Sequence, residues 1–424
     1  EKVTLRLNGN KLIQYSIDRG VLNSLVQNKQ AIKVDSGTII LSAKGIKSVS
    51  NSVVNNSGTL IAEGITKKGG KIFLAASDGK VTNSGTIASN SSKNNAGLVR
   101  ITADEVSIKN NSKIEATGRN KGGIIEVGGS WQNSNKNVFQ ATKTSIEEDV
   151  VLDASAYDLG DGGEIVIWSD INNNNSKTTV KGNLKAEGGK LGGNGGRIET
   201  SGFSIDINEA KVSTNSINGK AGEWLIDPYN ITISSSGSSD YTANEDDEVI
   251  DVSLLETSLN SSNITVFTGN SGSQDGNITV SSSISSGSSN NLTLRSANDI
   301  SINANITRSG SGGLILEPGS NTVNGSGSIS LTAGSNISTS TGANVSNNIQ
   351  LNGSGNIGFG GSGTSTYSGT ISGSGNLNKI DNGTVILSGT NTYSGDTTIS
   401  AGTFRTTGTL ADTTDVTVSS GSIY

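Results

Sequence analysis

The chain has 424 residues, of which 31% are hydrophobic and 4% aromatic, and its formal net charge is −6. It contains no cysteine and no histidine, which excludes disulfides and cysteine-based sites and removes the commonest general base and metal ligand. Because it has neither a basic stripe with interleaved aromatic residues nor an apolar run of about 18 residues, we expect no nucleic-acid partner and no membrane-spanning segment.

The first predicted element is a short helix over residues 18–28. Its apolar residues fall on one helical face, behind Asp18 as a candidate N-cap: Val21, Leu22, Leu25 and Val26. We expect this helix to decorate one coil of a larger, strand-based fold.

A glycine followed by a short alternating strand then recurs six times. The six glycines are Gly70, Gly97, Gly123, Gly163, Gly196 and Gly222. The steps between them are 27, 26, 40, 33 and 26 residues, the spacing expected of a coil that winds once and stacks on the one before it. The sequence therefore predicts a solenoid.

Side chains on a strand alternate between two faces, so the second and fourth residues after each glycine share one side, and they are nearly all apolar. The first and third residues carry most of the charges and are expected to face outward. The low hydrophobic content suits a narrow tube with one continuous core. The residues predicted to form it are Ile72, Leu74, Val99, Ile101, Ile125, Val127, Ile165, Ile167 and Ile198.

The composition changes near Asp227-Pro228. Of the 31 Lys and Arg residues, 27 precede residue 230, whereas 14 of the 37 acidic residues follow it. The first part therefore has a formal charge of +4 and the second of −10. We expect a change of repeat type at this point.

Residues 230–261 are predicted to form a transition with an acidic loop and a second short helix. The acidic run Glu245–Glu248 is interpreted as solvated, with weak cation binding as the alternative. The helix is predicted to begin at Ser253, which has capping-box spacing to Glu256. Its apolar side holds Leu254, Leu255 and Leu259.

Short strands alternate with Ser, Gly and Asn turns from residue 262 to 370, as in ITV at 264–266 and LIL at 314–316. Asn and Gly tolerate left-handed backbone at the corners, and stacked Asn side chains are expected to hydrogen-bond along the tube. Residues 371–424 form a separate unit, with GTVILSG at 383–389 and NTYSGDTTI at 391–399.

Four pieces of the first part are more specific: 25–32 running into 37–43, GGSWQ at 128–132, IVIWSD at 165–170 and GKAGEWLIDPYNITI at 219–233. They resemble the filamentous haemagglutinin and high-molecular-weight adhesin family, the large exoproteins of two-partner secretion in Gram-negative bacteria. Residues 389–403 resemble the autotransporter-associated strand repeat of passenger domains. Both resemblances imply a right-handed parallel β-helix that is exported through an outer-membrane barrel transporter. The chain lacks Asn-Pro pairs, which mark that family's secretion domain, so we expect a middle segment of a longer protein.

Parallel β-helices also house polysaccharide lyases and hydrolases. The best local carboxylate cluster is Asp153, Asp158, Asp161 and Glu164, but a glycosidase needs two carboxylates about 5 to 9.5 Å apart in a cleft. Here the acids sit among Ser, Gly and Tyr in a pattern typical of a turn. We therefore predict no catalytic, cofactor or metal site. Three tryptophans could stack on sugars, but packing is the preferred interpretation: Trp131, Trp168 and Trp224.

Asn-x-Ser/Thr triplets recur in the second part, and some members of the resembled family are glycosylated at such triplets. A chain this rich in Asn, Ser and Thr also produces them by composition alone, so glycosylation stays open. The candidates are Asn230, Asn263, Asn277, Asn291 and Asn305, followed by Asn336 and Asn344.

We predict a structural and binding segment of a large secreted or surface-exposed bacterial adhesin, which would act in cell adhesion, aggregation or biofilm formation. It would engage a receptor or glycan on a host or neighbouring cell multivalently, through its repeated outward face. The alternatives are a β-helical carbohydrate-active enzyme and the stalk of a contact-dependent toxin. The predicted domains are residues 1–229, 230–261, 262–370 and 371–424.

Overall fold

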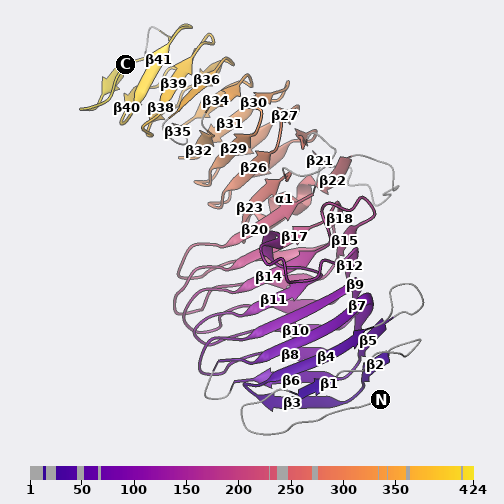
Figure 1. Cartoon of the computed structure of the whole chain (residues 1–424). Coiled ribbons are helices and arrows are strands. Elements are labelled where there is room, and N and C mark those ends of the chain that lie inside the picture. Colours follow the sequence, from indigo (N-terminus) through magenta and orange to yellow (C-terminus); the bar gives the residue numbers. More distant parts are fainter. Residues whose placement is uncertain are drawn as a thin grey trace. The chain divides into compact units, whose positions relative to one another are not determined.

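The computed structural model describes residues 13–15, 25–44, 52–64, 68–228, 230–235, 247–269, 276–332, 334–340, 342–359, 363–411 and 414–424. The chain divides into two compact units, Glu1–Asp227 and Pro228–Tyr424. Both units are parallel β-helices, in which strands pair in parallel with strands of the neighbouring coil (Figure 1). The predicted all-β solenoid is therefore confirmed. The finer division at residues 229, 261 and 370 stays a prediction.

The first unit has three faces. Face 1 consists of β1 (Ile13–Tyr15), β4 (Thr38–Lys44), β7 (Lys71–Asn83), β9 (Leu98–Ile108), β11 (Ile124–Val127), β14 (Glu164–Trp168), β17 (Arg197–Ser201) and β20 (Glu223–Asp227). Face 2 consists of β2 (Leu25–Asn28), β5 (Ser52–Asn56), the later halves of β7 and β9, β12 (Lys143–Ile146), β15 (Lys177–Val180) and β18 (Ser204–Asp206). Face 3 consists of β3 (Ala31–Asp35), β6 (Thr59–Glu63), β8 (Thr86–Ala88), β10 (Lys113–Glu115), β13 (Val151–Asp153), β16 (Asn183–Lys185) and β19 (Lys211–Ser213).

The core of the first unit is the one that the alternation predicts. All nine residues expected to point inward are fully buried, which confirms that prediction. They pair across coils in register, so that Ile125, Ile165 and Ile198 lie directly over one another in β11, β14 and β17. Burying an aliphatic side chain of this size contributes about 1.5–3 kcal/mol.

The repeated glycines form a column of touching backbones, here called the glycine column. A Cβ atom built on Gly97 would lie 1.9 Å from the carbonyl oxygen of Gly70. One built on Gly163 would lie 2.0 Å from that of Gly123, and one on Gly222 1.8 Å from that of Gly196. The same carbonyls accept inter-coil hydrogen bonds from the residue after each glycine. The repeat therefore uses glycine because a side chain would hold adjacent coils apart.

The predicted helix over residues 18–28 is wrong where the structure describes it. Leu25–Asn28 is the strand β2, which pairs in parallel with β5, and residues 18–24 lie outside the described parts of the chain. Burial alternates along it, with Val26 buried and Leu25 exposed. The Asn28 amide also donates to Asn56 Oδ1 at 2.8 Å, in the next coil. Pairing and this polar contact outweigh the helical spacing of the apolar residues.

The second unit has the same construction with shorter coils. Its first face consists of β23 (Asn263–Phe267), β26 (Leu292–Ser296), β29 (Leu314–Pro318), β32 (Asn336–Thr339), β35 (Ser354–Phe359), β38 (Asn376–Lys379), β40 (Thr397–Ile399) and β42 (Val416–Val418). Its second consists of β22 (Asp247–Asp251), β21 (Asn230–Ser234), β24 (Ile278–Val280), β27 (Ile300–Ile302), β30 (Thr322–Asn324), β33 (Asn344–Val345), β36 (Thr364–Tyr367), β39 (Thr384–Leu387) and β41 (Thr403–Thr406). Its third consists of β25 (Ile284–Ser286), β28 (Ile306–Arg308), β31 (Ile329–Thr332), β34 (Ile349–Asn352) and β37 (Ile371–Gly373).

The second short helix exists as α1 (Val252–Ser258), and its three predicted apolar residues are buried. Its N-cap is Asp251, whose carboxylate accepts from the Ser253 N–H at 2.7 Å, so the cap predicted at Ser253 is wrong. Among the described parts of the chain, no helix has the length and hydrophobicity of a transmembrane span.

The acidic run before this helix is only partly described. Asp247 and Glu248 belong to β22, not to a loop, and Glu248 is buried. β22 pairs with β21 over five residues, and this backbone pairing draws the end of the acidic run into the sheet. Glu245 and Asp246 lie outside the described residues.

Candidate functional site

The longest coil of the first unit carries an extra segment, residues 128–142, which lies over the outward side of face 1. It contains the short 3₁₀ turn Trp131–Asn133. Gly129 packs against the Trp168 indole, because a Cβ placed there would lie 2.3 Å from the ring. The indole N–H of Trp168 donates to Gln140 Oε1 at 3.1 Å. This covering segment turns part of an outward face into a second, outer core.

A fully buried carboxylate, Glu199 of β17, lies under the covering segment. Its oxygens accept from the Gln132 N–H at 2.8 Å and from the Ser201 hydroxyl at 2.9 Å. Burial raises the pKa of the Glu199 carboxyl to about 8, and the Asp227 and Glu164 carboxylates also raise this pKa, whereas the two hydrogen bonds lower it. Glu199 is therefore mostly protonated at neutral pH.

A stacked cation closes the outer side of this cluster. The Arg197 guanidinium lies 4.1 Å from the centroid of the Trp131 ring, and its Nε donates to Glu164 Oε2 at 2.7 Å. The alternation of side chains along the strand predicts that Glu199 faces solvent. That expectation is wrong, because residues of the covering segment lie over this side of the strand. The neighbouring strand β14 carries a sequence signal for this burial. Its residues 165–168 are all apolar, and such a run predicts that both faces of the strand are buried.

The Glu199 cluster gives the first unit a pH-dependent stability. The carboxyl binds a proton more tightly in the folded than in the unfolded chain, so its contribution is complete below the unfolded pKa of about 4.5 and is lost as the pH rises through about 8. We expect the melting temperature of the first unit to fall between pH 5 and pH 8. In Glu199→Gln this fall should be smaller. Tryptophan fluorescence reports the transition, because all three tryptophans precede residue 228. An unchanged slope in the variant would contradict the assignment.

The four carboxylates weighed as a catalytic cluster are bound to different partners. Asp158 pairs with Arg119 at 2.7 Å, and Asp161 Oδ1 accepts from the Asn194 N–H at 2.7 Å. Asp153 Oδ1 accepts from the Ser155 N–H at 2.9 Å, and Glu164 binds Arg197 as described. Within the described residues, no group of three or more acidic side chains could hold a metal ion.

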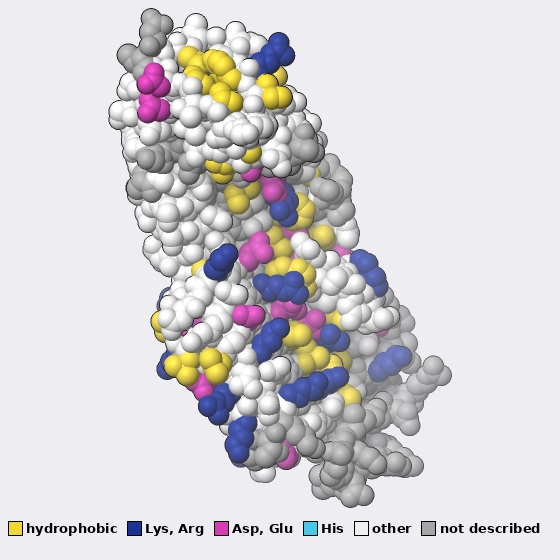
Figure 2. All heavy atoms as spheres, turned by 90° about the vertical axis from the view of Figure 1, so that its left-hand side faces the viewer, with side chains coloured by type: hydrophobic (Ala, Val, Ile, Leu, Met, Phe, Trp, Pro, Cys, Tyr) yellow, Lys and Arg dark blue, Asp and Glu magenta, His cyan; other side chains and the backbone are white. Residues whose placement is uncertain are grey.

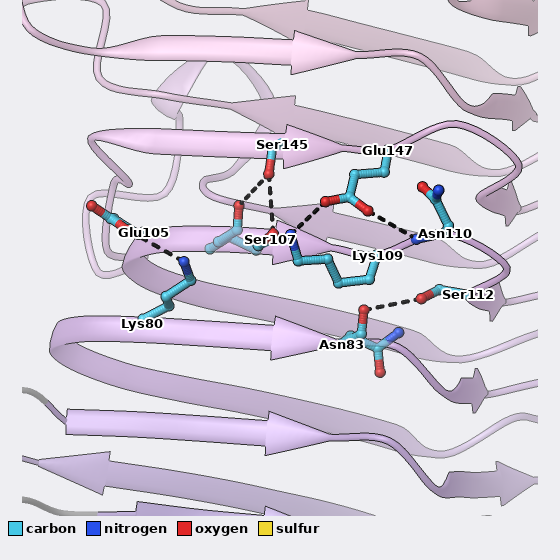
Figure 3. A network of polar contacts seen from close by, with 10 residues as sticks. Lys80, Asn83, Glu105, Ser107, Lys109, Asn110, Ser112, Ser145 and Glu147 are labelled. Carbon is cyan, nitrogen blue, oxygen red and sulfur yellow. Dashed lines mark hydrogen bonds and ion pairs between the residues drawn. The ribbon is translucent and has the colours of Figure 1, made fainter.

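Two pairs of charged side chains, on face 2 and at the corner that follows it, likewise connect neighbouring coils (Figure 3). Lys80 of β7 lies 3.6 Å from Glu105 of β9, and Lys109 pairs with Glu147 in the next coil. Glu147 also accepts from the Asn110 N–H at 3.1 Å. These four side chains therefore hold neighbouring coils together, which is a structural role.

Two of the three tryptophans are fully buried, in agreement with the preferred interpretation. Trp224 points into the tube and donates its indole N–H to Thr200 Oγ1 at 3.1 Å. Trp168 is enclosed under the covering segment. Trp131 is half-buried and carries Arg197 against one ring face.

The candidate glycosylation residues share one structural role. Each begins a strand or directly precedes one. In this position the side-chain oxygen accepts from a backbone N–H of the next coil. Five do so at 2.8–3.1 Å: Asn230, Asn263, Asn277, Asn291 and Asn305. Asn336 and Asn344 lie in β32 and β33. The expected hydrogen bonding of Asn along the tube is therefore confirmed, and glycosylation stays a prediction.

Two cations in the second unit, Arg308 and Lys379, are buried and donate to backbone carbonyls. Arg308 donates to the carbonyl oxygens of Gly312 and Asn290, at 3.3 and 2.5 Å. Lys379 donates to those of Asp381 and Ala401, the latter at 3.3 Å. Burial lowers the pKa of both side chains. Neither cation is among the residues expected inside the tube, although Arg308 lies two residues after the inward Ile306, and Lys379 two residues after the inward Leu377.

The coil that holds Lys379 contains other buried polar groups. The Tyr393 hydroxyl lies 2.6 Å from Thr397 Oγ1, inside the tube. Asn391 is buried at a corner, where its amide donates to the Gly389 and Thr409 carbonyls at 3.0 and 3.1 Å. Residues 377–405 match the family model of the passenger-associated transport repeat. No curated protein matches the chain.

The passenger-associated repeat points to the passenger domain of a surface-exposed, autotransporter-type protein. It is consistent with a location outside the cell or on the outer-membrane surface. It also agrees with the resemblance noted for residues 389–403. The resemblance to filamentous haemagglutinin, and two-partner secretion with it, stays a prediction.

We expect Lys379→Ala to destabilise the second unit by about 2–4 kcal/mol. The change removes buried methylene groups and leaves the Asp381 and Ala401 carbonyls without this donor. Lys379→Met keeps most of the apolar volume, so it should cost less and isolate the polar contribution. Circular dichroism follows both units, whereas tryptophan fluorescence follows the first alone. A shift in the fluorescence transition, or no shift in either signal, would contradict this expectation.

Proposed function

We propose that the chain is a structural and binding segment of a secreted or surface-exposed bacterial adhesin. The observation that carries the proposal is the passenger-associated repeat within a parallel β-helix. The expected partner is a receptor or glycan on a host or neighbouring cell, and an outer-membrane barrel would transport the chain during secretion.

The mechanism is geometric. Coils stacked at about 4.8 Å present similar loops at regular intervals, so a weak contact made by one loop can be repeated along the same edge. Repetition raises the overall affinity without any single deep site, because later contacts form at a high effective concentration. The carboxylates and cations of the coils support this reading, since many of them are bound to one another and hold the scaffold.

Beads that carry the purified chain at graded densities test the proposal on fixed epithelial cells and on a second bacterial strain. We expect adhesion to rise more steeply than in proportion to the density of the chain. Beads that carry heat-unfolded chain are the control, because they keep the composition and lose the coils. Equal adhesion of beads that carry folded chain and beads that carry unfolded chain, or no adhesion of either, would overturn the proposal.

The enzyme alternative makes a separate prediction. We expect no turnover of pectic, galactan or glycosaminoglycan polymers, with or without calcium, because the best carboxylate cluster is engaged by Arg119, Arg197 and backbone amides. Release of reducing ends or unsaturated products is the measurement. Product that disappears in Asp158→Asn or Asp161→Asn would favour the carbohydrate-active enzyme instead.

A further inference from the structure

Five loops of the first unit, which join face 3 to face 1 in successive coils, stack into one edge. They are residues 89–97, 116–123, 154–163, 186–196 and 214–222, here called the loop edge. Backbone hydrogen bonds connect them, as between the Leu159 N–H and the Arg119 carbonyl at 2.9 Å, and between the Leu191 N–H and the Asp158 carbonyl at 2.8 Å. The Asn218 amide donates to the Lys190 carbonyl at 2.7 Å. The loop edge is therefore a fixed surface.

Three aliphatic side chains project from successive loops of this edge. Leu159 is 48% exposed, Leu191 67% and Ile217 68%. Large aliphatic side chains at this exposure are unusual in a chain whose hydrophobic residues are mostly inside. They stand on loops that are already fixed by hydrogen bonds, so the fold itself gains little from them.

Basic side chains accompany the aliphatic ones. The loop edge has five basic residues, Lys93, Arg119, Lys121, Lys190 and Lys220, and all of them are exposed. Its three acidic residues are Asp158, Asp161 and Glu187, and each is engaged, by Arg119, the Asn194 N–H and the Ser213 hydroxyl respectively. Figure 2 shows basic and hydrophobic side chains close together on one face of the first unit.

We propose that the loop edge binds the surface of an anionic lipid bilayer. Lysines near such a surface are attracted to the headgroups, and Leu or Ile at loop tips can enter the boundary of the acyl chains. Charge complementarity selects the anionic surface, because the acids of the edge are occupied and its lysines are exposed. The composition favours lipid over a protein partner, since four of the five basic residues of the edge are lysines, and lysine is depleted at protein interfaces.

This inference goes beyond the proposed adhesin function, because it names a lipid surface and does not depend on a cell-surface receptor. Recognition of an anionic bilayer by stacked loops would hold the coil axis along the membrane plane. The edge of one unit would then contact lipid through several loops at once, and each loop would add to the same attachment.

The test is sedimentation of the full chain with two kinds of vesicles, one of phosphatidylcholine alone and one of phosphatidylcholine mixed with the anionic lipid phosphatidylglycerol. We expect binding to the anionic vesicles only. The double variants Leu191→Ser/Ile217→Ser and Lys190→Glu/Lys220→Glu should each weaken the partition coefficient by roughly tenfold or more. The matched controls Phe139→Ser and Lys143→Glu change exposed residues outside the edge and should bind like the parent chain.

Salt should reduce binding of the parent chain and have less effect on the lysine variant. Equal binding to neutral vesicles, or full binding by either edge variant, would overturn the proposal. Binding to a soluble acidic polypeptide such as polyglutamate without binding to anionic vesicles would assign the edge to a protein partner and would also overturn it. Adhesion of coated beads to cells is a separate measurement. A failure of the chain to bind lipid would therefore overturn this inference without deciding the proposed adhesin function.

Discussion

Replacing Gly163 by alanine is expected to destabilise the first unit by more than about 4 kcal/mol, a loss reserved for severe core changes. The new Cβ atom would lie 2.0 Å from the Gly123 carbonyl oxygen and 2.7 Å from that of Ala154. Neither carbonyl can move away cheaply. The Gly123 carbonyl accepts the Glu164 N–H at 2.8 Å, and the Ala154 carbonyl accepts the N–H of Gly163 itself. The coils on either side must separate, which breaks hydrogen bonds and opens the core.

Gly37→Ala is the matched control for this change. Gly37 precedes the column by one coil, and its carbonyl accepts the Lys71 N–H. The nearest atoms to a Cβ on Gly37 would be side-chain carbons of Val34, at 3.3 Å, and no backbone atom outside its chain neighbours would lie closer than 3.9 Å. We expect a small effect there, within about 1 kcal/mol. Thermal unfolding followed by tryptophan fluorescence compares the two. Similar melting temperatures for both variants would show that backbone contact in the glycine column does not hold the coils together.

Ile165→Asp should be equally damaging for a different reason. Ile165 is fully buried between Ile125 and Ile198. The substitution forfeits about 1.5–3 kcal/mol of apolar burial and places an unpaired carboxylate in the core. We expect a loss of several kcal/mol and failure of the first unit to fold near physiological temperature.

Lys143→Asp provides the outward control, because Lys143 is exposed at the start of β12 and the change introduces the same charged group. It should alter the free energy of unfolding by less than about 1 kcal/mol. If Ile165→Asp instead unfolded at the temperature of the control, the stacked core inferred from the alternation would be wrong.

The fold was accessible from the sequence because two simple periodicities are repeated many times. The two-residue alternation of side chains along a strand identifies inward residues such as Ile165. The recurring glycine marks where each coil returns to face 1. Short single elements were less predictable. Leu25–Asn28 satisfies both a helical face and an alternating strand, and only the neighbouring β5 decides between them. The cap at Asp251 in place of Ser253 is the usual uncertainty at a helix boundary.

The candidate site was less accessible for a physical reason. Alternation says which side of a strand faces the tube, but it cannot say what covers the other side. Glu199 is buried by Gln132 and its neighbours, which lie 67 residues earlier in the chain. The length of that coil, 40 residues against 26–33 in the others, was visible, but the position of its extra segment over β14 and β17 was not. Likewise, Lys379 occupies an inward position that alternation assigns, whereas the carbonyls that accept its hydrogen bonds come from corners of the chain.

The glycine column also determines how the first unit responds to mechanical tension. Its inter-coil hydrogen bonds run along the axis, so a pull along that direction loads the coils in series, and an outermost coil can peel away while the others stay folded. Each released coil frees the 26–40 residues between successive glycines, roughly 90–140 Å of extended chain. A stretched molecule would therefore lengthen in separate steps and dissipate work at each one. Such behaviour would protect a surface attachment from abrupt rupture under flow.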